Sequence, residues 1–204
     1  MPSGSTSDLD IEVWRLARAG VDDLVTRIRA EDWGCPTPCV EWDVHDLVNH
    51  LVGSNQRHVM LLRGGNEHDF WVTRATEDVL TDDPPADWKF SADALDAAFV
   101  ERGAMDRTIS YRLPTGRALL RGRVFDVTVH TWDLARAIGV DVTLDKRLVA
   151  ACLASPLAAT LAHGEGLPAT DDHEQLAAPP RSPLADDASD QERLLWLCGR
   201  SHFG

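Results

Sequence analysis

The first part of the chain repeats apolar residues at steps of three and four, the spacing that places side chains on one face of an α-helix. The positions concerned are Leu9, Val13, Leu16, Gly20, Leu24 and Ile28. This pattern predicts an amphipathic helix from Asp8 to about Ala30. Two prolines and a glycine between Trp33 and Trp42 then predict an irregular connection, because both residue types interrupt regular elements.

A second helix is predicted from Asp43 to about Arg63. The carboxylate of Asp43 can accept a hydrogen bond from a free backbone amide of the first turn. Gly64-Gly65 should end the helix, because glycine adopts left-handed conformations at little steric cost. Helical spacing places His50 and His58 on the face that is expected to meet the core. Two histidines on such a face are the first sign of chemistry in the sequence.

The middle of the chain carries less regular patterns. Residues 67–89 contain two adjacent prolines and several acids, and they are predicted to form a loop with at most a short helical turn. Ser91 is a suitable N-cap for a third helix from Ala92 to about Arg102. Residues 107–113 include several β-type residues and precede a Pro-Thr-Gly turn, which predicts a short extended excursion.

Helical spacing returns in the C-terminal half. It predicts a fourth long helix from about Leu119 to Ile138 and another helix over Leu144 to Ala162, which Pro156 should kink or split because proline lacks a backbone N–H. Residues 164–190 are expected to form a surface connection, and residues 191–200 a short final helix. Long helices with few strands indicate an all-α protein built as a four-helix bundle with short extra helices.

Length and composition fit one domain over residues 1–204, since 44% of the residues are hydrophobic and 26% are charged. The 33 acidic and 20 basic residues give a formal net charge of −13, which argues against nucleic acid and anionic membranes as partners. Four cysteines are too few for a disulfide scaffold, and the polar N-terminus lacks the order of a secretory signal. We therefore expect a cytoplasmic protein that acts on a small molecule, with a homodimer as a possible assembly.

Asp126 and His130 stand four residues apart on the fourth long helix, so both side chains point to the same side. A carboxylate and an imidazole at this spacing can chelate one metal ion. His50 is the best candidate for a third ligand, because helix bundles build sites from side chains on facing helices. Asp133 could be a ligand or could accept a hydrogen bond from an imidazole. Three ligands with an open fourth position are typical of catalytic zinc; the alternative is that these histidines are ordinary core residues.

Two segments resemble a known protein family. Residues 37–53 read TPCVEWDVHDLVNHLVG, and residues 126–137 read DVTVHTWDLARA. Both look like signature segments of the DinB-like family, in the actinobacterial branch related to the metal-binding domain of mycothiol-dependent maleylpyruvate isomerase. Residues 191–200 also look like the closing segment of that branch. The resemblance implies a DinB-like four-helix bundle that carries one mononuclear divalent metal site.

By this resemblance the metal ligands are His50, Asp126 and His130; the isomerase has glutamate at the position of Asp126. Zinc is the expected ion, although two imidazoles and a carboxylate do not distinguish it from nickel, iron or manganese. Relatives use such an ion to deliver a low-molecular-weight thiol to an electrophile. Mycothiol is therefore the co-substrate that the resemblance implies.

These observations leave three hypotheses for function. The first is a thiol S-transferase or thiol-assisted isomerase that acts on a small electrophile. The second is a metal-dependent hydrolase or specialised-metabolism enzyme that uses no thiol, and the third is a non-catalytic metal-binding module. His58 is a candidate general base or anion-binding residue, and Asn55, Trp132 and Asp133 are candidate substrate contacts. Each of these four could instead be an ordinary structural residue, and Cys39 is interpreted as a small buried hydrophobe.

Overall fold

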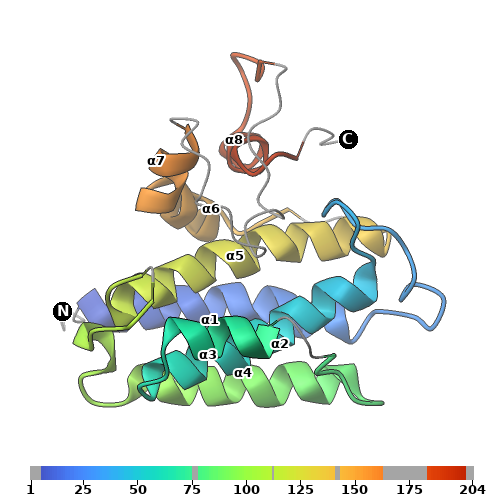
Figure 1. Cartoon of the computed structure of the whole chain (residues 1–204). Helices are drawn as coiled ribbons and strands as arrows, with labels where there is room; N and C mark the ends of the chain where they lie inside the picture. The colour runs from blue at the N-terminus through green and yellow to red at the C-terminus, as the bar shows by residue number, and fades with distance from the viewer. Residues whose placement is uncertain (1–5, 75–77, 112, 141–142, 163–182, 201–204) are drawn as a thin grey trace.

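Four long helices form a bundle in which each helix packs against two of the others. They are α1 (Thr6–Val25), α2 (Val44–Leu62), α4 (Pro84–Val100) and α5 (Gly116–Ala137). The computed structural model describes residues 6–74, 78–111, 113–140, 143–162 and 183–200. In it, α1 packs on α4 and α5, and α2 packs on the same two helices (Figure 1). The predicted all-α bundle is confirmed.

Shorter helices are added to this bundle. α3 (Glu67–Arg74) contacts α2, and the 3₁₀ helix η1 (Ala104–Asp106) contacts α4 and α5. α6 (Lys146–Leu153), α7 (Pro156–Ala162) and α8 (Asp190–Leu197) form a separate group on the outer side of α5, drawn in orange to red above the bundle in Figure 1. α6 contacts α7 and α8 within this group, and it also contacts α5 of the bundle. The predicted break at Pro156 is thus confirmed, because α6 ends before it and α7 begins at it.

α5 is covered on two sides and therefore lies between two hydrophobic clusters. Its residues Leu120 and Val127 belong to the core of the four-helix bundle. Its residues Phe125 and Val129 belong to a second cluster that is completed by side chains from α6, α7 and α8. Every residue from Val127 to Ala135 is buried. Side chains on α5 can therefore reach both the bundle and the added helices.

The ends of α2 follow the sequence prediction. The Asp43 side chain accepts a hydrogen bond of 2.9 Å from the backbone N–H of Asp46. The backbone N–H of Asp43 donates in return to the Asp46 carboxylate at 3.2 Å, which completes a capping box. Gly64, just beyond the end of the helix, has a φ of 99°, a value that glycine adopts without strain. These two ends fix the position of His50 along α2.

The start of α4 corrects a predicted boundary. The helix begins at Pro84 rather than at Ala92, and the side chain of Asp83 caps it by accepting a 3.2 Å hydrogen bond from Ala86. Adjacent prolines fit here because the first turn of a helix leaves its N–H groups without helical partners. Ser91 lies buried inside α4 and donates to the carbonyl of Trp88. The prediction of a loop over residues 67–89 is also wrong, because α3 and the start of α4 occupy parts of this range.

Other boundaries differ by less. α1 ends at Val25 instead of Ala30, and the chain then turns where Asp32 accepts hydrogen bonds from Arg29. The extended excursion over 107–113 is reduced to isolated bridges, such as the antiparallel one between Thr108 and Thr115. Most of the predicted surface connection over 164–190, namely residues 164–182, lies outside the described residues. No helix in the described part of the chain has the length and apolar character needed to traverse a lipid bilayer.

Candidate metal centre

The three predicted ligands come together between α2 and α5. Asp126 Oδ1 lies 3.4 Å from His50 Nε2 and 3.2 Å from His130 Nε2. The two imidazole rings are 5.0 Å apart between centroids and nearly perpendicular, at 71°. One ligand atom from each residue lies within 4.8 Å of the other two. His50 and His130 are buried, whereas 20% of the Asp126 side chain is exposed, so Asp126 is the most exposed of the three.

The spacing and hydrogen bonding of this cluster fit a divalent ion. Two ligands of a tetrahedral zinc ion with bonds of about 2.0–2.1 Å are about 3.3–3.4 Å apart, close to the separations found here. His130 Nε2 is buried and makes no hydrogen bond within the described part of the chain. Such a nitrogen is costly unless something else satisfies it. A metal ion that accepts its lone pair is one solution.

The other ring nitrogen of His130 is held by Asp133. His130 Nδ1 lies 2.9 Å from Asp133 Oδ2. Burial raises the pKa of Asp133, but the charge and hydrogen bonds of Arg200, with the hydrogen bond from His130, hold it at about 2. An ionised carboxylate only accepts hydrogen bonds, so Nδ1 carries the proton. In the neutral ring this leaves the lone pair on Nε2, facing Asp126 and His50.

Asp126 is held by Arg123, one turn earlier on α5. Arg123 donates from Nη1 to Asp126 Oδ2, and from Nε to Asn55 Oδ1 at 3.0 Å. Its Nη2 donates to the Leu51 carbonyl on α2 at 2.6 Å. Burial raises the pKa of the Asp126 carboxyl, but the charges of His50, His130 and Arg123 hold it well below its ordinary value. Asp126 is therefore a carboxylate with Oδ1 directed at the two imidazoles.

The pKa of His130 shows how strongly this cluster attracts positive charge. Burial lowers the pKa of the imidazole, but the charge of Asp126 and the hydrogen bond to Asp133 raise it well above its ordinary value. The Asp126 carboxylate thus favours a cation beside it, whether that cation is a proton on the ring or a metal ion in its place.

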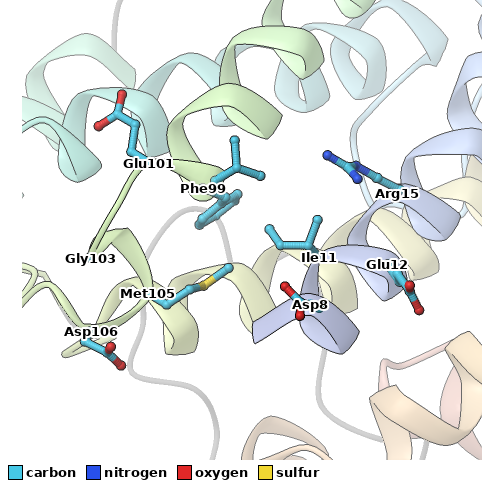
Figure 2. Close-up of a pocket in the computed structure, with 10 residues that line it drawn as sticks. Asp8, Ile11, Glu12, Arg15, Phe99, Glu101, Gly103, Met105 and Asp106 are labelled. Carbon is cyan, nitrogen blue, oxygen red and sulfur yellow. The ribbon is translucent and has the colours of Figure 1, made fainter. Parts of the chain in front are cut away.

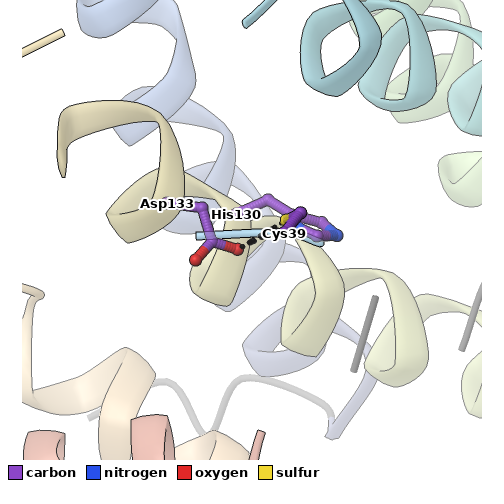
Figure 3. Close-up of side chains that lie close together, drawn as sticks. All are labelled: Cys39, His130 and Asp133. Atoms are coloured by element: carbon purple, nitrogen blue, oxygen red, sulfur yellow. Dashed lines mark hydrogen bonds and ion pairs between the residues drawn. The ribbon is translucent and has the colours of Figure 1, made fainter. Parts of the chain in front are cut away.

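Two further groups of metal-binding residue types occur in the described structure but have other partners. Cys39 Sγ lies 3.4 Å from Asp133 Oδ2 and 3.7 Å from His130 Nδ1. Figure 3 shows the three side chains close together. The guanidinium of Arg200 also contacts this sulfur at 3.4 Å, so a positive charge already occupies the group. The second group, Asp43 with Asp46 and a neighbouring histidine, is used for the capping box of α2.

The remaining predicted site residues lie around the cluster in different ways. His58 donates from Nδ1 to the Ser54 carbonyl at 2.7 Å. Although part of its surface is exposed, its dense surroundings and the charge of Arg123 lower its pKa to about 4. Asn55 is fully buried, and its Nδ2 donates to Ser91 Oγ. Trp132 packs in the second hydrophobic cluster, beside α6 to α8.

Sequence reasoning missed three residues that contact the ligands or their supports. Trp42 packs against both imidazoles, with its centroid 5.0 Å from that of His50 and 6.1 Å from that of His130. Arg123 could have been found, because it stands three residues before Asp126 on the same helix face. Trp42 and Arg200 lie in segments that resemble the family, but no helical spacing links either residue to the ligands.

A cavity of about 350 Å³ lies elsewhere, between α1, α4 and η1. Figure 2 shows its apolar side chains Ile11, Phe99 and Met105 surrounded by acidic residues. Arg15 at its edge donates to Asp96 at 2.9 Å. None of the three candidate metal ligands lines this cavity, so the metal cluster and the cavity are separate features of the described structure.

Comparisons with known proteins assign the chain to a family. Residues 14–135 match the family model described as the mycothiol maleylpyruvate isomerase N-terminal domain. Two uncharacterized proteins of Mycobacterium tuberculosis strains, Rv0738 and MT0763, are each 33% identical to this chain over 178 residues. These alignments cover 80% of this chain and 85% of each relative. No solved structure matches.

Proposed function

The chain belongs to the family of the mycothiol maleylpyruvate isomerase N-terminal domain, and from this premise we propose that it is a divalent-metal-dependent enzyme with a thiol co-substrate. His50, Asp126 and His130 hold the ion, which we propose to be zinc. The thiol is of the mycothiol type, and the reaction is a thiol transfer to a small electrophile or a thiol-assisted isomerisation. The observation that carries the proposal is the convergence of two imidazole nitrogens and one carboxylate oxygen from facing helices.

The three side chains supply a donor set suited to this role. A divalent ion held there would lower the pKa of a thiol bound to it, so that thiolate is available at neutral pH. Asp126 offers Oδ1 while Arg123 holds Oδ2, and Asp133 keeps the His130 ring oriented. Trp42 packs against the two imidazoles and places an apolar surface beside them.

The charges around the site favour an anionic ligand such as a thiolate. Asp126 is paired with Arg123, and Asp133 is paired with Arg200. With neutral imidazoles, these residues bring no uncompensated negative charge to the site. Both positive charges of a divalent ion would then be available to an incoming anion, and burial strengthens that attraction.

Titration of the cobalt-substituted protein with mycothiol tests this proposal. We expect a new sulfur-to-cobalt absorption band in the near-ultraviolet and a change in the visible spectrum that saturates with thiol. S-methyl mycothiol is the matched control, because it keeps the rest of the molecule and cannot form a thiolate. Cobalt binding with identical spectra before and after addition of mycothiol would contradict a thiol function and favour the metal-dependent hydrolase instead.

His58 is expected to be dispensable for thiol binding. With a pKa of about 4 the imidazole is neutral at pH 7, and its Nδ1–H is already used by the Ser54 carbonyl. We expect His58→Gln to change the apparent mycothiol affinity of the cobalt protein by less than about threefold, because a neutral group of this kind adds little to anion binding. A loss of mycothiol affinity of tenfold or more would contradict this expectation and indicate that His58 is an anion-binding residue.

A further inference from the structure

Arg200 is the last residue that the structure describes, and its side chain is buried against the C-terminal part of α5. It lies just beyond α8, and its partner Asp133 stands 67 positions earlier in the chain. Arg200 Nε donates to Asp133 Oδ1 at 3.0 Å, and Nη2 donates to Asp133 Oδ2. The two oxygens are thus held by a two-pronged guanidinium contact, which fixes the plane of the carboxylate.

The same guanidinium is tied to the surrounding backbone and loop. Nη1 donates to the Cys198 carbonyl at 2.6 Å, and Nη2 contacts Cys39 Sγ at 3.4 Å. Arg200 therefore joins three parts of the chain: the end of α8, the loop before α2, and α5. A lysine could supply the positive charge but not the planar geometry that these contacts use.

The contacts continue from Arg200 to the candidate ligand. Asp133 Oδ2, which receives Nη2 of Arg200, also receives Nδ1–H of His130 at 2.9 Å. A carboxylate fixed in this way admits one orientation of the ring, with Nε2 directed toward Asp126 Oδ1 at 3.2 Å. If the carboxylate could rotate, the ring and its Nε2 would no longer be held in this direction.

We propose that Arg200 is a positioning residue of the metal centre. Acting through Asp133, it holds the His130 ring so that Nε2 is presented to the ion. This inference rests on the proposed metal site and adds a requirement to it. The site is completed by a residue beyond positions 14–135, the part of the chain that matches the family model.

Metal affinity of purified variants tests the inference, with zinc measured by competition against a chelator and cobalt by its visible spectrum. We expect Arg200→Gln to weaken zinc binding by about 10- to 100-fold and to alter the cobalt spectrum. Asp133→Asn should weaken binding at least as much. The double variant should bind no more weakly than Asp133→Asn alone, because Arg200 acts only through Asp133.

Two additional variants separate positioning from folding. Arg193→Gln is the matched control on α8, since Arg193 is exposed and donates to the Ala188 carbonyl. It should bind zinc as the unaltered protein does. Arg200→Lys keeps the buried positive charge, so it should remain folded while its cobalt spectrum and zinc affinity move toward those of Arg200→Gln. A merely structural role would instead lower the melting temperature and leave the metal affinity of the folded protein unchanged.

The outcomes distinguish this inference from the proposed function. Unchanged zinc affinity and cobalt spectra in both Arg200 variants, with tight binding by the unaltered protein, would overturn the positioning role and leave the metal site intact. Additive losses in the double variant would also overturn it, because Arg200 would then act by another route. Failure of the unaltered protein to bind either metal would overturn the metal site and this inference together.

Discussion

Replacing His50 by alanine is expected to weaken zinc binding by about 100- to 1000-fold. Structural zinc sites with four ligands contribute about 10–16 kcal/mol in all, so one ligand corresponds to about 2.5–4 kcal/mol, and each 1.4 kcal/mol is about tenfold in affinity. The measurement is chelator competition at constant pH. His50 suits this test because it comes from α2, whereas the other two ligands share α5.

His45→Ala is the matched control for this variant. His45 is on the first turn of the same helix, its side chain is 42% exposed, and its Nε2 lies 3.3 Å from Asp78 Oδ2. Its replacement should leave the zinc affinity within about twofold of that of the unaltered protein, because a surface ion pair contributes little and is not part of the site. Equal affinities for the His50 and His45 variants would contradict the assignment of His50 as a ligand.

Replacing Arg123 by methionine is expected to cost about 3–5 kcal/mol of unfolding free energy. The side chain is fully buried, and its loss leaves the Asp126 carboxylate and the Asn55 amide without their main partner. Methionine keeps much of the volume, so the cost reports lost polar contacts more than a cavity. Urea unfolding of the metal-free protein measures this effect.

Arg121→Met supplies the comparison for the Arg123 variant. Arg121 stands two residues earlier on α5 and pairs at the surface with Asp10 at 3.0 Å. An ion pair with one half-exposed side chain contributes about 0–1 kcal/mol to the unfolding free energy, so its loss should be hard to detect. Adding Asp126→Asn to Arg123→Met should recover part of the lost stability, since the uncompensated charge is removed. Similar unfolding free energies for the two single arginine variants would contradict a central role of Arg123.

Local signals in the sequence predicted the parts of the fold that depend on local chemistry. Asp43 and the glycine after Arg63 marked both ends of α2, because caps act within one turn of the chain. The spacing of Asp126 and His130 predicted that they share a face of α5. The same rules failed at Pro84, since adjacent prolines are equally compatible with a loop and with the first turn of a helix.

The surroundings of the ligands depend on tertiary packing, and sequence patterns do not contain that information. Arg200 reaches Asp133 only because α8 packs beside α5, and Trp42 reaches the imidazoles from a loop. Asn55, a candidate substrate contact in the sequence, accepts hydrogen bonds from Arg123, which no sequence pattern indicated. The polar partners that orient a site are therefore harder to predict than the residues at its centre.

The two nitrogens of the His130 ring face two different parts of the molecule. Nε2 faces the bundle, and Nδ1 faces Asp133, which Arg200 contacts from the end of α8. By thermodynamic linkage, a ligand that binds more tightly when this ring is fixed must stabilise the docked state of α8 by the same free energy. Binding of such a ligand beside His130 would then be measurable as slower hydrogen exchange in the backbone amides of α8.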